Sequence, residues 1–304
     1  HLGAKVTLVD SLIPEYGGNL WNVFDIKNDV AVNISDVRDP YAMRVLVEGK
    51  DFLFNLAGQT SHLDSMHNPH TDLSINAESQ LSILEACRKI NPRIKIVFAS
   101  TRQLYGRPQY LPVNEAHPIE PVDVNGINKW AGEWYHILYN RVYDIPCSVL
   151  RLTNTYGPGM RVKDARQTFV GIWIKSVLEG AKFKIFGDGK QRRDFNYVDD
   201  VVDALLAAAS NDRATGQTFN LGSKEVVSLN DLAEVLVKSA GTGSYEHIPF
   251  PADRKSIDIG DYFSDFGKIQ AALEWEPKVD LATGLTRTLD YYREHKKHYW
   301  DVIQ

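Results

Sequence analysis

A lysine and an asparagine four residues apart are the pair in this sequence best placed to do chemistry. Asn125 and Lys129 lie in the segment 121–133, and a spacing of four residues puts two side chains on the same face of a helix. A lysine ammonium there can lower the pKa of a neighbouring acid and prepare it for proton transfer. The amide of Asn125 exchanges no proton near neutral pH, so the acid–base partner of this lysine is missing from the expected position.

The elements that must position these residues follow an alternating pattern through the first half of the chain. Short apolar runs predict strands, and longer amphipathic segments between them predict helices. The expected strands are 5–9, 30–33, 52–55, 94–99 and 146–151, and the expected helices are 76–89 and 126–143. Strands that alternate with helices predict an α/β fold with a parallel sheet covered on both faces.

After Gly157 and Pro158 the regular alternation of predicted strands and helices ends. Helices are expected near 169–179, 201–209, 229–240 and 281–294, separated by short strands. This pattern predicts a smaller lobe at the carboxyl edge of the sheet, where open α/β sheets bind ligands. We expect residues 1–156 to form one domain with 192–222 packed back onto it, and 157–304 to form mainly the second lobe.

Composition excludes several classes of partner. The chain has 304 residues, of which 43% are hydrophobic and 24% charged, with a formal net charge of −5. This balance gives no reason to expect a nucleic acid or an anionic membrane surface as partner. No apolar run approaches the roughly 20 residues that span a bilayer. Cys87 and Cys147 fit buried thiols in a reducing compartment, which predicts a cytoplasmic protein, and no cluster of His and Cys predicts a metal site.

The start of the sequence looks incomplete. Residues 3–10 resemble the end of a first helix that runs into the second strand of a dinucleotide-binding unit. A first strand and a Gly-rich phosphate turn are expected before them. We expect that a few dozen residues precede the sequence. The alternative is a fold that starts with this strand and binds no dinucleotide.

Six motifs carry a resemblance to a known family. They are Asp10, Asp36-Val37, 55–59, 98–106, 121–133, and 151–159 with 187–201. In this order and spacing they resemble the extended short-chain dehydrogenase/reductase family, specifically its nucleotide-sugar epimerase and dehydratase branch. The resemblance covers essentially the whole chain. It implies a Rossmann-like doubly wound sheet with a smaller mixed α/β lobe, NAD as cofactor, a nucleotide-diphosphate sugar as substrate and a homodimer.

The resemblance also implies a set of cofactor-binding residues. Asp10 would accept hydrogen bonds from the adenosine ribose and repel a 2′-phosphate, which favours NAD over NADP. Gly58 permits close approach of the backbone to a ligand. The remaining residues implied to bind NAD are Asp36, Val37, Leu56, Ala57, Gln59, Asn76, Ser100, Lys129 and Leu152.

The reacting and substrate-binding residues are implied in the same way. Thr101 stands where the family has a hydroxyl that hydrogen-bonds the sugar oxygen, Lys129 where it has its lysine, and Asn125 where it has a tyrosine. Arg193 would meet the diphosphate with its planar guanidinium. The other residues implied to bind substrate are Asn154, Gln167 and Arg254.

The two residues after Thr101 indicate which reaction of the family to expect. Relatives that eliminate water place an Asp-Glu pair there, and this chain has Arg102 and Gln103. We therefore expect an epimerase that acts through hydride abstraction and a keto-sugar. The alternatives are a nucleotide-sugar dehydrogenase or reductase and a catalytically silent protein that binds a nucleotide sugar or NAD.

Asn125 leaves the proton transfer open. A natural enzyme could use Thr101, Tyr105, His62 or a water relay in place of the tyrosine, and an engineered exchange of a tyrosine would give the same sequence. In the implied homodimer, the helix with Lys129 and the preceding long helix form the interface. Met66, Ile83 and Trp134 are its expected contributors.

Overall fold

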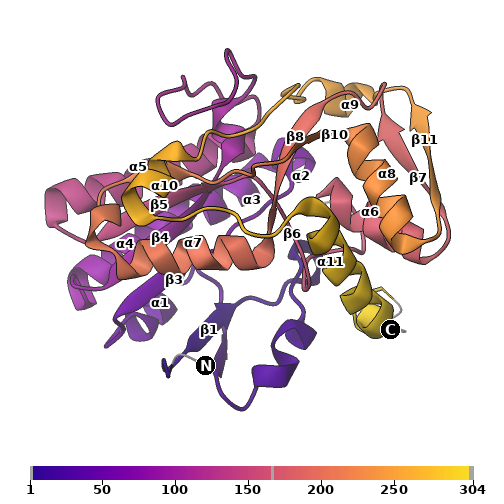
Figure 1. The fold of residues 1–304 in the computed structure, drawn as a ribbon. Coiled ribbons are helices and arrows are strands. Elements are labelled where there is room, and N and C mark those ends of the chain that lie inside the picture. The colour runs from indigo at the N-terminus through magenta and orange to yellow at the C-terminus, as the bar shows by residue number, and fades with distance from the viewer. Residues whose placement is uncertain (1–2, 166–167, 301–304) are drawn as a thin grey trace.

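The computed structural model describes residues 3–165 and 168–300 (Figure 1). Its largest sheet has four parallel strands in the order β3-β4-β5-β9. They are β3 (Phe52–Asn55), β4 (Lys95–Thr101), β5 (Cys147–Leu152) and β9 (Thr218–Asn220). Two further parallel strands, β1 (Thr7–Asp10) and β2 (Ala31–Ile34), pair with each other in a separate sheet.

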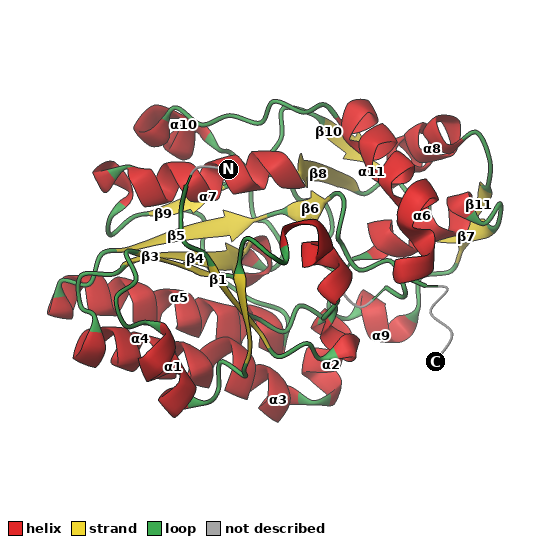
Figure 2. Ribbon diagram, turned by 90° about the horizontal axis from the view of Figure 1, so that it is seen from below, coloured by secondary structure: helices red, strands yellow, loops and turns green. Residues whose placement is uncertain are grey.

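Helices cover both faces of the four-stranded sheet (Figure 2). One face carries α1 (Pro40–Leu46), α4 (Ser79–Ile90) and α5 (Val124–Tyr143), and the other carries α7 (Val198–Ser210) and α10 (Gly267–Leu273). Consecutive residues of β4 show why the strand is apolar throughout. Ile96 packs with the α4 side, whereas Val97 packs with the α7 side, and neither has exposed surface. Successive side chains of a strand point to opposite faces, so a strand buried on both faces must be apolar at every position.

A second apolar core gathers the later elements. It is built on two small sheets, one with the order β10-β8-β6 and the other pairing β11 with β7. Their strands are β6 (Asn154–Tyr156), β7 (Lys182–Phe186), β8 (Arg192–Tyr197), β10 (Val226–Ser228) and β11 (Ser244–Ile248). The helices packed with them are α6 (Phe169–Leu178), α8 (Leu229–Ala240) and α11 (Leu281–His295).

Short elements connect these layers. The α-helical ones are α2 (His62–His67), α3 (Pro69–Leu73) and α9 (Ala252–Lys255), and η3 (Ser74–Glu78) is a π-helical turn. The 3₁₀ turns are η1 (Pro14–Tyr16), η2 (Leu20–Ile26), η4 (Arg102–Tyr105), η5 (Asp212–Ala214) and η6 (Lys296–His298).

The expected α/β fold is confirmed, and each predicted strand and helix is present. The bounds of β3 and α8 agree with the prediction to the residue. The helix predicted over 76–89 differs, because its first turn is the π-helical η3 and the α-helix begins only at Ser79. Ser79 Oγ and Gln80 Nε2 both donate to the carbonyl oxygen of Ile75, and side-chain bonds of this kind compete with regular helix bonds.

The segment 192–222 divides between the layers. Its β9 belongs to the four-stranded sheet and its α7 packs against that sheet, whereas β8 pairs with β6 and β10. Cys87 and Cys147 are buried free thiols, and burial raises the pKa of both. Among the described residues, no helix combines the length and the apolar character needed to cross a bilayer.

Candidate active site

The candidate site lies at the carboxyl ends of strands β3, β4 and β5. Thr101 closes β4 and lies opposite Leu152, the last residue of β5, in the parallel register. The loop after β3 contains Gly58. A Cβ added at Gly58 would lie 2.7 Å from Lys129 Nζ and 2.9 Å from Asn76 Oδ1, so only glycine fits at this approach.

Lys129 is held inside the protein by the helix that carries it. Its side chain is buried, and Nζ donates a hydrogen bond of 3.1 Å to the carbonyl oxygen of Ala99 on β4. Burial disfavours the charged ammonium and lowers the pKa of Lys129 to about 8, although the nearby charge of Asp72 opposes this shift. The site therefore holds a cation whose charge is lost just above neutral pH.

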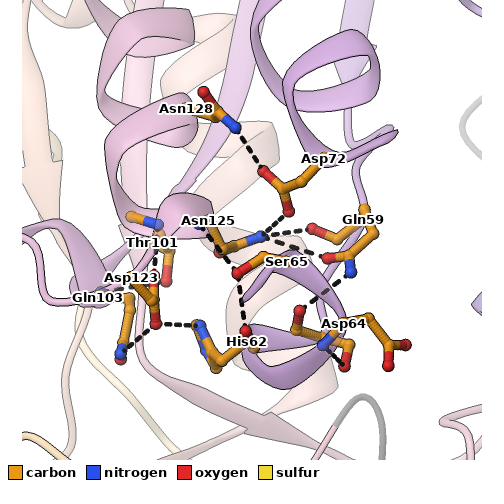
Figure 3. A network of polar contacts seen from close by, with 12 residues as sticks. Gln59, His62, Asp64, Ser65, Asp72, Thr101, Gln103, Asp123, Asn125 and Asn128 are labelled. Carbon is orange, nitrogen blue, oxygen red and sulfur yellow. Dashed lines mark hydrogen bonds and ion pairs between the residues drawn. The ribbon is translucent and has the colours of Figure 1, made fainter. Parts of the chain in front are cut away.

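Asn125 is built into a network of hydrogen bonds (Figure 3). Its Nδ2 donates to the Gln59 carbonyl oxygen at 2.8 Å and to Asp72 Oδ2 at 3.0 Å, and its backbone N donates to Ser65 Oγ at 3.2 Å. The side chain is almost fully buried. Asn125 thus connects α5 to the loop after β3, and its amide group is occupied by structural bonds.

Asp72 is a central residue that sequence reasoning missed. Its buried carboxylate accepts from Asn125, from Asn128 Nδ2 at 2.8 Å and from Asn76 Nδ2 at 3.0 Å. Three amides replace the water that a buried carboxylate would otherwise need. The spacing of four residues between Asp72 and Asn76 was the available signal, because it puts both on one helical face.

A second buried carboxylate, Asp123, was also missed. It caps α5 by accepting from Gly126 N at 2.7 Å, and Gln103 Nε2 donates to its other oxygen at 2.8 Å. That oxygen also lies 2.9 Å from His62 Nδ1. Burial raises the pKa of Asp123, but the contacts with His62 and the donors from Gly126 and Gln103 outweigh burial and hold the pKa below its ordinary value.

Thr101 and Tyr105 occupy different environments. Thr101 is partly buried, and its Oγ1 accepts from Gln103 N at 3.2 Å and caps η4. Tyr105 is fully buried, donates to Asn220 Oδ1 at 2.7 Å, and has its pKa raised to about 12 by burial. The alternative in which Tyr105 replaces the missing tyrosine is therefore wrong, because its hydroxyl is enclosed and bonded.

The residues implied to bind the adenosine end lie at the ends of the first two strands. Asp10 ends β1, and its Oδ1 accepts from Leu12 N at 2.7 Å. Asp36 follows β2 and bonds the guanidinium of Arg38, which lowers the pKa of Asp36. Val37 packs at the edge of the core formed with α1. Both residues lie at the carboxyl end of this small parallel sheet.

The residues implied to bind the rest of the cofactor differ in how exposed they are. Leu56 is exposed, and Ala57, Gly58 and Leu152 are partly buried. Ser100 differs, because its hydroxyl is buried and donates to Glu133 Oε2 at 2.9 Å. Only the backbone of Ser100 is left to contact a cofactor.

Two arginines gather on the substrate side. Arg102 Nη2 donates to Asn154 Oδ1 at 3.0 Å, and Asn154 Nδ2 donates to the Asp194 carbonyl oxygen at 2.9 Å. Arg193 is buried, donates to the Arg192 carbonyl oxygen at 2.9 Å and lies 3.8 Å from Asp258. Burial, followed by the charge of Arg102, lowers the pKa of Arg193 to about 10. This pairing of like charges predicts an anionic ligand.

Of the other two residues implied to bind substrate, only Arg254 is described, and it does not join this group. The guanidinium of Arg254 lies 5.5 Å from the ring centre of Phe186, and no contact in the described chain connects it to Arg193. Gln167 lies outside the described residues. Among residues 3–165 and 168–300, no cluster of His, Cys, Asp and Glu could hold a metal ion.

Comparison with known proteins establishes the class. The sequence model of the NAD dependent epimerase/dehydratase family matches residues 3–222. The chain is 30% identical over 303 residues to the UDP-glucose 4-epimerase of Mycolicibacterium smegmatis, and the match covers 94% of each protein. The chain belongs to this family and is an NAD-dependent enzyme.

Solved structures agree with this assignment. The UDP-glucose 4-epimerase from Thermotoga maritima, solved with UDP-glucose, superposes with a TM-score of 0.85 at 30% identity, covering 97% of this chain and 92% of that one. An epimerase from Methanothermobacter thermautotrophicus has a TM-score of 0.90 at 25% identity, covering 97% and 86%. The Rossmann-like fold of this family is therefore confirmed.

The residues around Gly58 fit NAD. Asn76 Oδ1 is buried without a hydrogen-bond partner among the described residues. The Lys129 ammonium and the glycine lie beside it. An unpaired buried acceptor is costly, which is expected where a ligand supplies the missing donor. Asn76, Gly58 and Lys129 would hold the ribose and nicotinamide side of the cofactor, with Asp10 and Asp36 at the adenosine end.

Replacing Lys129 by methionine should stabilise the protein at pH 7. The lowered pKa, about 8 against an ordinary 10.5, corresponds to about 3 kcal/mol of desolvation, and loss of the bond to Ala99 offsets about 1 kcal/mol. Lys129→Met should therefore raise the free energy of unfolding in urea by about 1–2 kcal/mol. Between pH 8 and 10.5 the unfolded lysine binds more protons than the folded one, so wild-type stability rises with pH and the difference shrinks.

Lys184→Met is the matched control, because Lys184 is exposed on β7. It should change the free energy of unfolding by less than about 0.5 kcal/mol. A Lys129→Met variant that is less stable than wild type at pH 7 would show that the burial of Lys129 carries no desolvation cost.

Proposed function

We propose that this protein is an epimerase that inverts one hydroxyl-bearing carbon of a nucleotide-diphosphate sugar. The observation that carries the proposal is that Thr101 and Lys129 meet the end of β4, where Arg102 follows and contacts Asn154 beside β8, the strand of Arg193, without a carboxylate at position 102 or 103. The relatives named as UDP-glucose 4-epimerases support it. NAD, when bound, supplies reversible hydride acceptance.

The chain's own residues supply positioning and charge. Thr101 would hydrogen-bond the oxygen of the reacting carbon, and the Lys129 ammonium would favour loss of hydride by placing a positive charge beside the nicotinamide ribose. Arg193 would bind the diphosphate, with Asn154 between it and the reacting end. Asn125 fixes the loop after β3 against α5 and so sets the distance between Lys129 and that loop.

Elimination of water is disfavoured by what occupies the two positions after Thr101. Gln103 Nε2 donates to Asp123, and Arg102 donates to Asn154. Neither side chain is a carboxylate that could remove or deliver a proton at the neighbouring sugar carbons. A dehydrogenase and a catalytically silent binding protein remain the alternatives that an experiment must separate.

A panel of UDP-, GDP-, CDP- and dTDP-sugars tests the reaction. The full protein with NAD should convert one of them to its epimer, followed by NMR, with no net rise in NADH absorbance. Net NADH formation would identify a dehydrogenase, and tight binding of a sugar without turnover would identify a silent protein. Asn125→Tyr should not raise the rate, because a tyrosine removes the bonds to Gln59 and Asp72. A large gain would show that Asn125 is a disabled tyrosine position.

Arg193→Ala should weaken binding of the nucleotide sugar by about 10- to 100-fold, since a hydrogen bond to a charged group contributes about 1.5–3 kcal/mol. Arg192→Ala is the matched control, because the Arg192 side chain is 52% exposed and pairs with Asp261. It should leave affinity unchanged in calorimetry. Equal effects of the two substitutions would remove Arg193 from the diphosphate site.

We also propose that two copies pair through α5. Ile127, Trp134, Leu138 and Val142 are 47–57% exposed and recur at intervals of seven and four residues, which puts them on one helical face. An exposed apolar stripe of this kind marks an interaction surface. Met66 is also exposed, but the expectation for Ile83 is wrong, because it is buried in the core between α4 and the sheet.

Leu138→Glu should convert a dimer to a monomer in light scattering after gel filtration, because a carboxylate would be buried unpaired at the interface. Leu206→Glu is the control, since Leu206 is also exposed but lies on α7 at the opposite face of the sheet. A wild-type monomer, or a dimer that survives Leu138→Glu, would contradict this interface.

The division of labour between the lobes is part of the same proposal. Residues 1–156, with 192–222, would bind NAD, and 157–304 would mainly bind the nucleotide sugar. The buried thiols Cys87 and Cys147 support a reducing, cytoplasmic location.

A further inference from the structure

Epimerisation needs an acid–base group that neither Asn125 nor Tyr105 supplies. The sugar hydroxyl must lose its proton when the carbon loses hydride, and regain it in the reverse step. The Asn125 amide donates to Gln59 and Asp72, and the Tyr105 hydroxyl is enclosed and bonded to Asn220. The group that moves the proton must therefore lie elsewhere in the site.

His62 lies near Asn125, with Ser65 between the two residues (Figure 3). It is the first residue of α2, and its carbonyl oxygen accepts from Ser65 Oγ at 2.7 Å. The same Ser65 Oγ accepts from Asn125 N at 3.2 Å. One serine hydroxyl therefore connects His62 to Asn125.

The ring of His62 lies beside a buried carboxylate. Nδ1 lies 2.9 Å from Asp123 Oδ2, and the Asp123 side chain has no exposed surface. Gly126 N and Gln103 Nε2 hold the two oxygens of Asp123. Nδ1 is buried and makes no hydrogen bond with the described residues in this geometry, so its contact with Asp123 is an ion-pair proximity. A carboxylate can only accept, so a proton on Nδ1 would suit this contact and would leave Nε2 free to accept a proton.

The free edge of the ring is accessible to a ligand. The His62 side chain is 36% exposed, and Nε2 has no hydrogen-bond partner in the described part of the chain. Gln103 connects the pair to the reacting end, because its backbone N donates to Thr101 Oγ1 while its side chain donates to Asp123. The histidine, its carboxylate and Thr101 thus belong to one network.

The elements of the pair and those near it in the chain or packed against it carry several charged groups. They are Asp64 on α2, Asp72 on α3, Asp123 and Lys129 on α5, and Arg102 after β4. Asp72 is occupied by three amides and Lys129 donates to Ala99. Asp123 is the carboxylate in direct contact with the ring.

We propose that His62, oriented by Asp123, is the acid–base residue of the epimerisation in place of the tyrosine. This inference rests on the proposed function. NAD, when bound, would supply the hydride acceptor for the reacting carbon. As that carbon is oxidised to a carbonyl, the sugar O–H bond would break and His62 Nε2 would take its proton. In the return step hydride adds to the other face of that carbon and Nε2 gives the proton back. The sugar is inverted, and NAD and His62 are unchanged.

The kinetic test compares two histidines of one helix. With the sugar found in the panel, His62→Ala should lower kcat by about 10²- to 10⁴-fold, the usual contribution of a general acid–base group, and leave the Kd of the sugar unchanged. Added imidazole should restore part of kcat in this variant. His67→Ala, at the exposed end of α2, should behave as wild type. Full activity of His62→Ala, or a loss of affinity without rescue by imidazole, would overturn the inference.

A second readout does not depend on turnover. In ¹⁵N-histidine spectra the His62 ring should carry its proton on Nδ1, Asp123→Asn should abolish that preference, and UDP-glucose with NAD should shift the Nε2 resonance. Asn at 123 can still cap α5 through its oxygen, so the fold is retained. If no sugar in the panel is turned over, the proposed function fails, and an Nε2 resonance that ignores the nucleotide sugar then overturns the role of His62 as well.

Discussion

The buried carboxylate of Asp72 is the group on which the rest of the site depends. It accepts from amides on η3 and on α5, namely Asn76, Asn125 and Asn128. It also supplies the negative charge that partly supports the buried Lys129 ammonium. A carboxylate without water is tolerated only when such donors surround it. Through Asp72 the loop after β3, the π-helical turn and α5 are fixed relative to one another.

This arrangement explains how a family member can keep its lysine and lose its tyrosine. Asn125 is not an empty position, because its amide hydrogen-bonds the Gln59 carbonyl oxygen and Asp72. The lysine retains the close contact with Gly58 and the bond to Ala99 that place its charge. Asn125 therefore has a structural role in this protein, beside a lysine that remains buried and bonded.

The two arginines Arg102 and Arg193 also influence each other through their charges. Arg102 follows Thr101 directly. Burial, followed by the charge of Arg102, lowers the pKa of Arg193. Like charges held together in a partly dry environment favour an anion between or beside them. Arg102 thus adds to the positive potential around Arg193.

The sequence alone determined the elements and the family. β4 could be predicted because a strand buried on both faces must be apolar throughout, and α5 because Lys129 and its neighbours follow the helical period. Thr101, Asn125, Lys129 and Arg193 were found because their motifs occur in order along the chain.

Only the tertiary structure decided which polar residues meet. Asp72 and Asn128 are 56 positions apart in the sequence, and Asp123 and His62 are 61 apart. Such pairs form where separate helices pack against each other, and no local spacing encodes that contact. Burial, which lowers the pKa of Lys129 and encloses Tyr105, is likewise a property of the packed chain and not of the residues around it in the sequence.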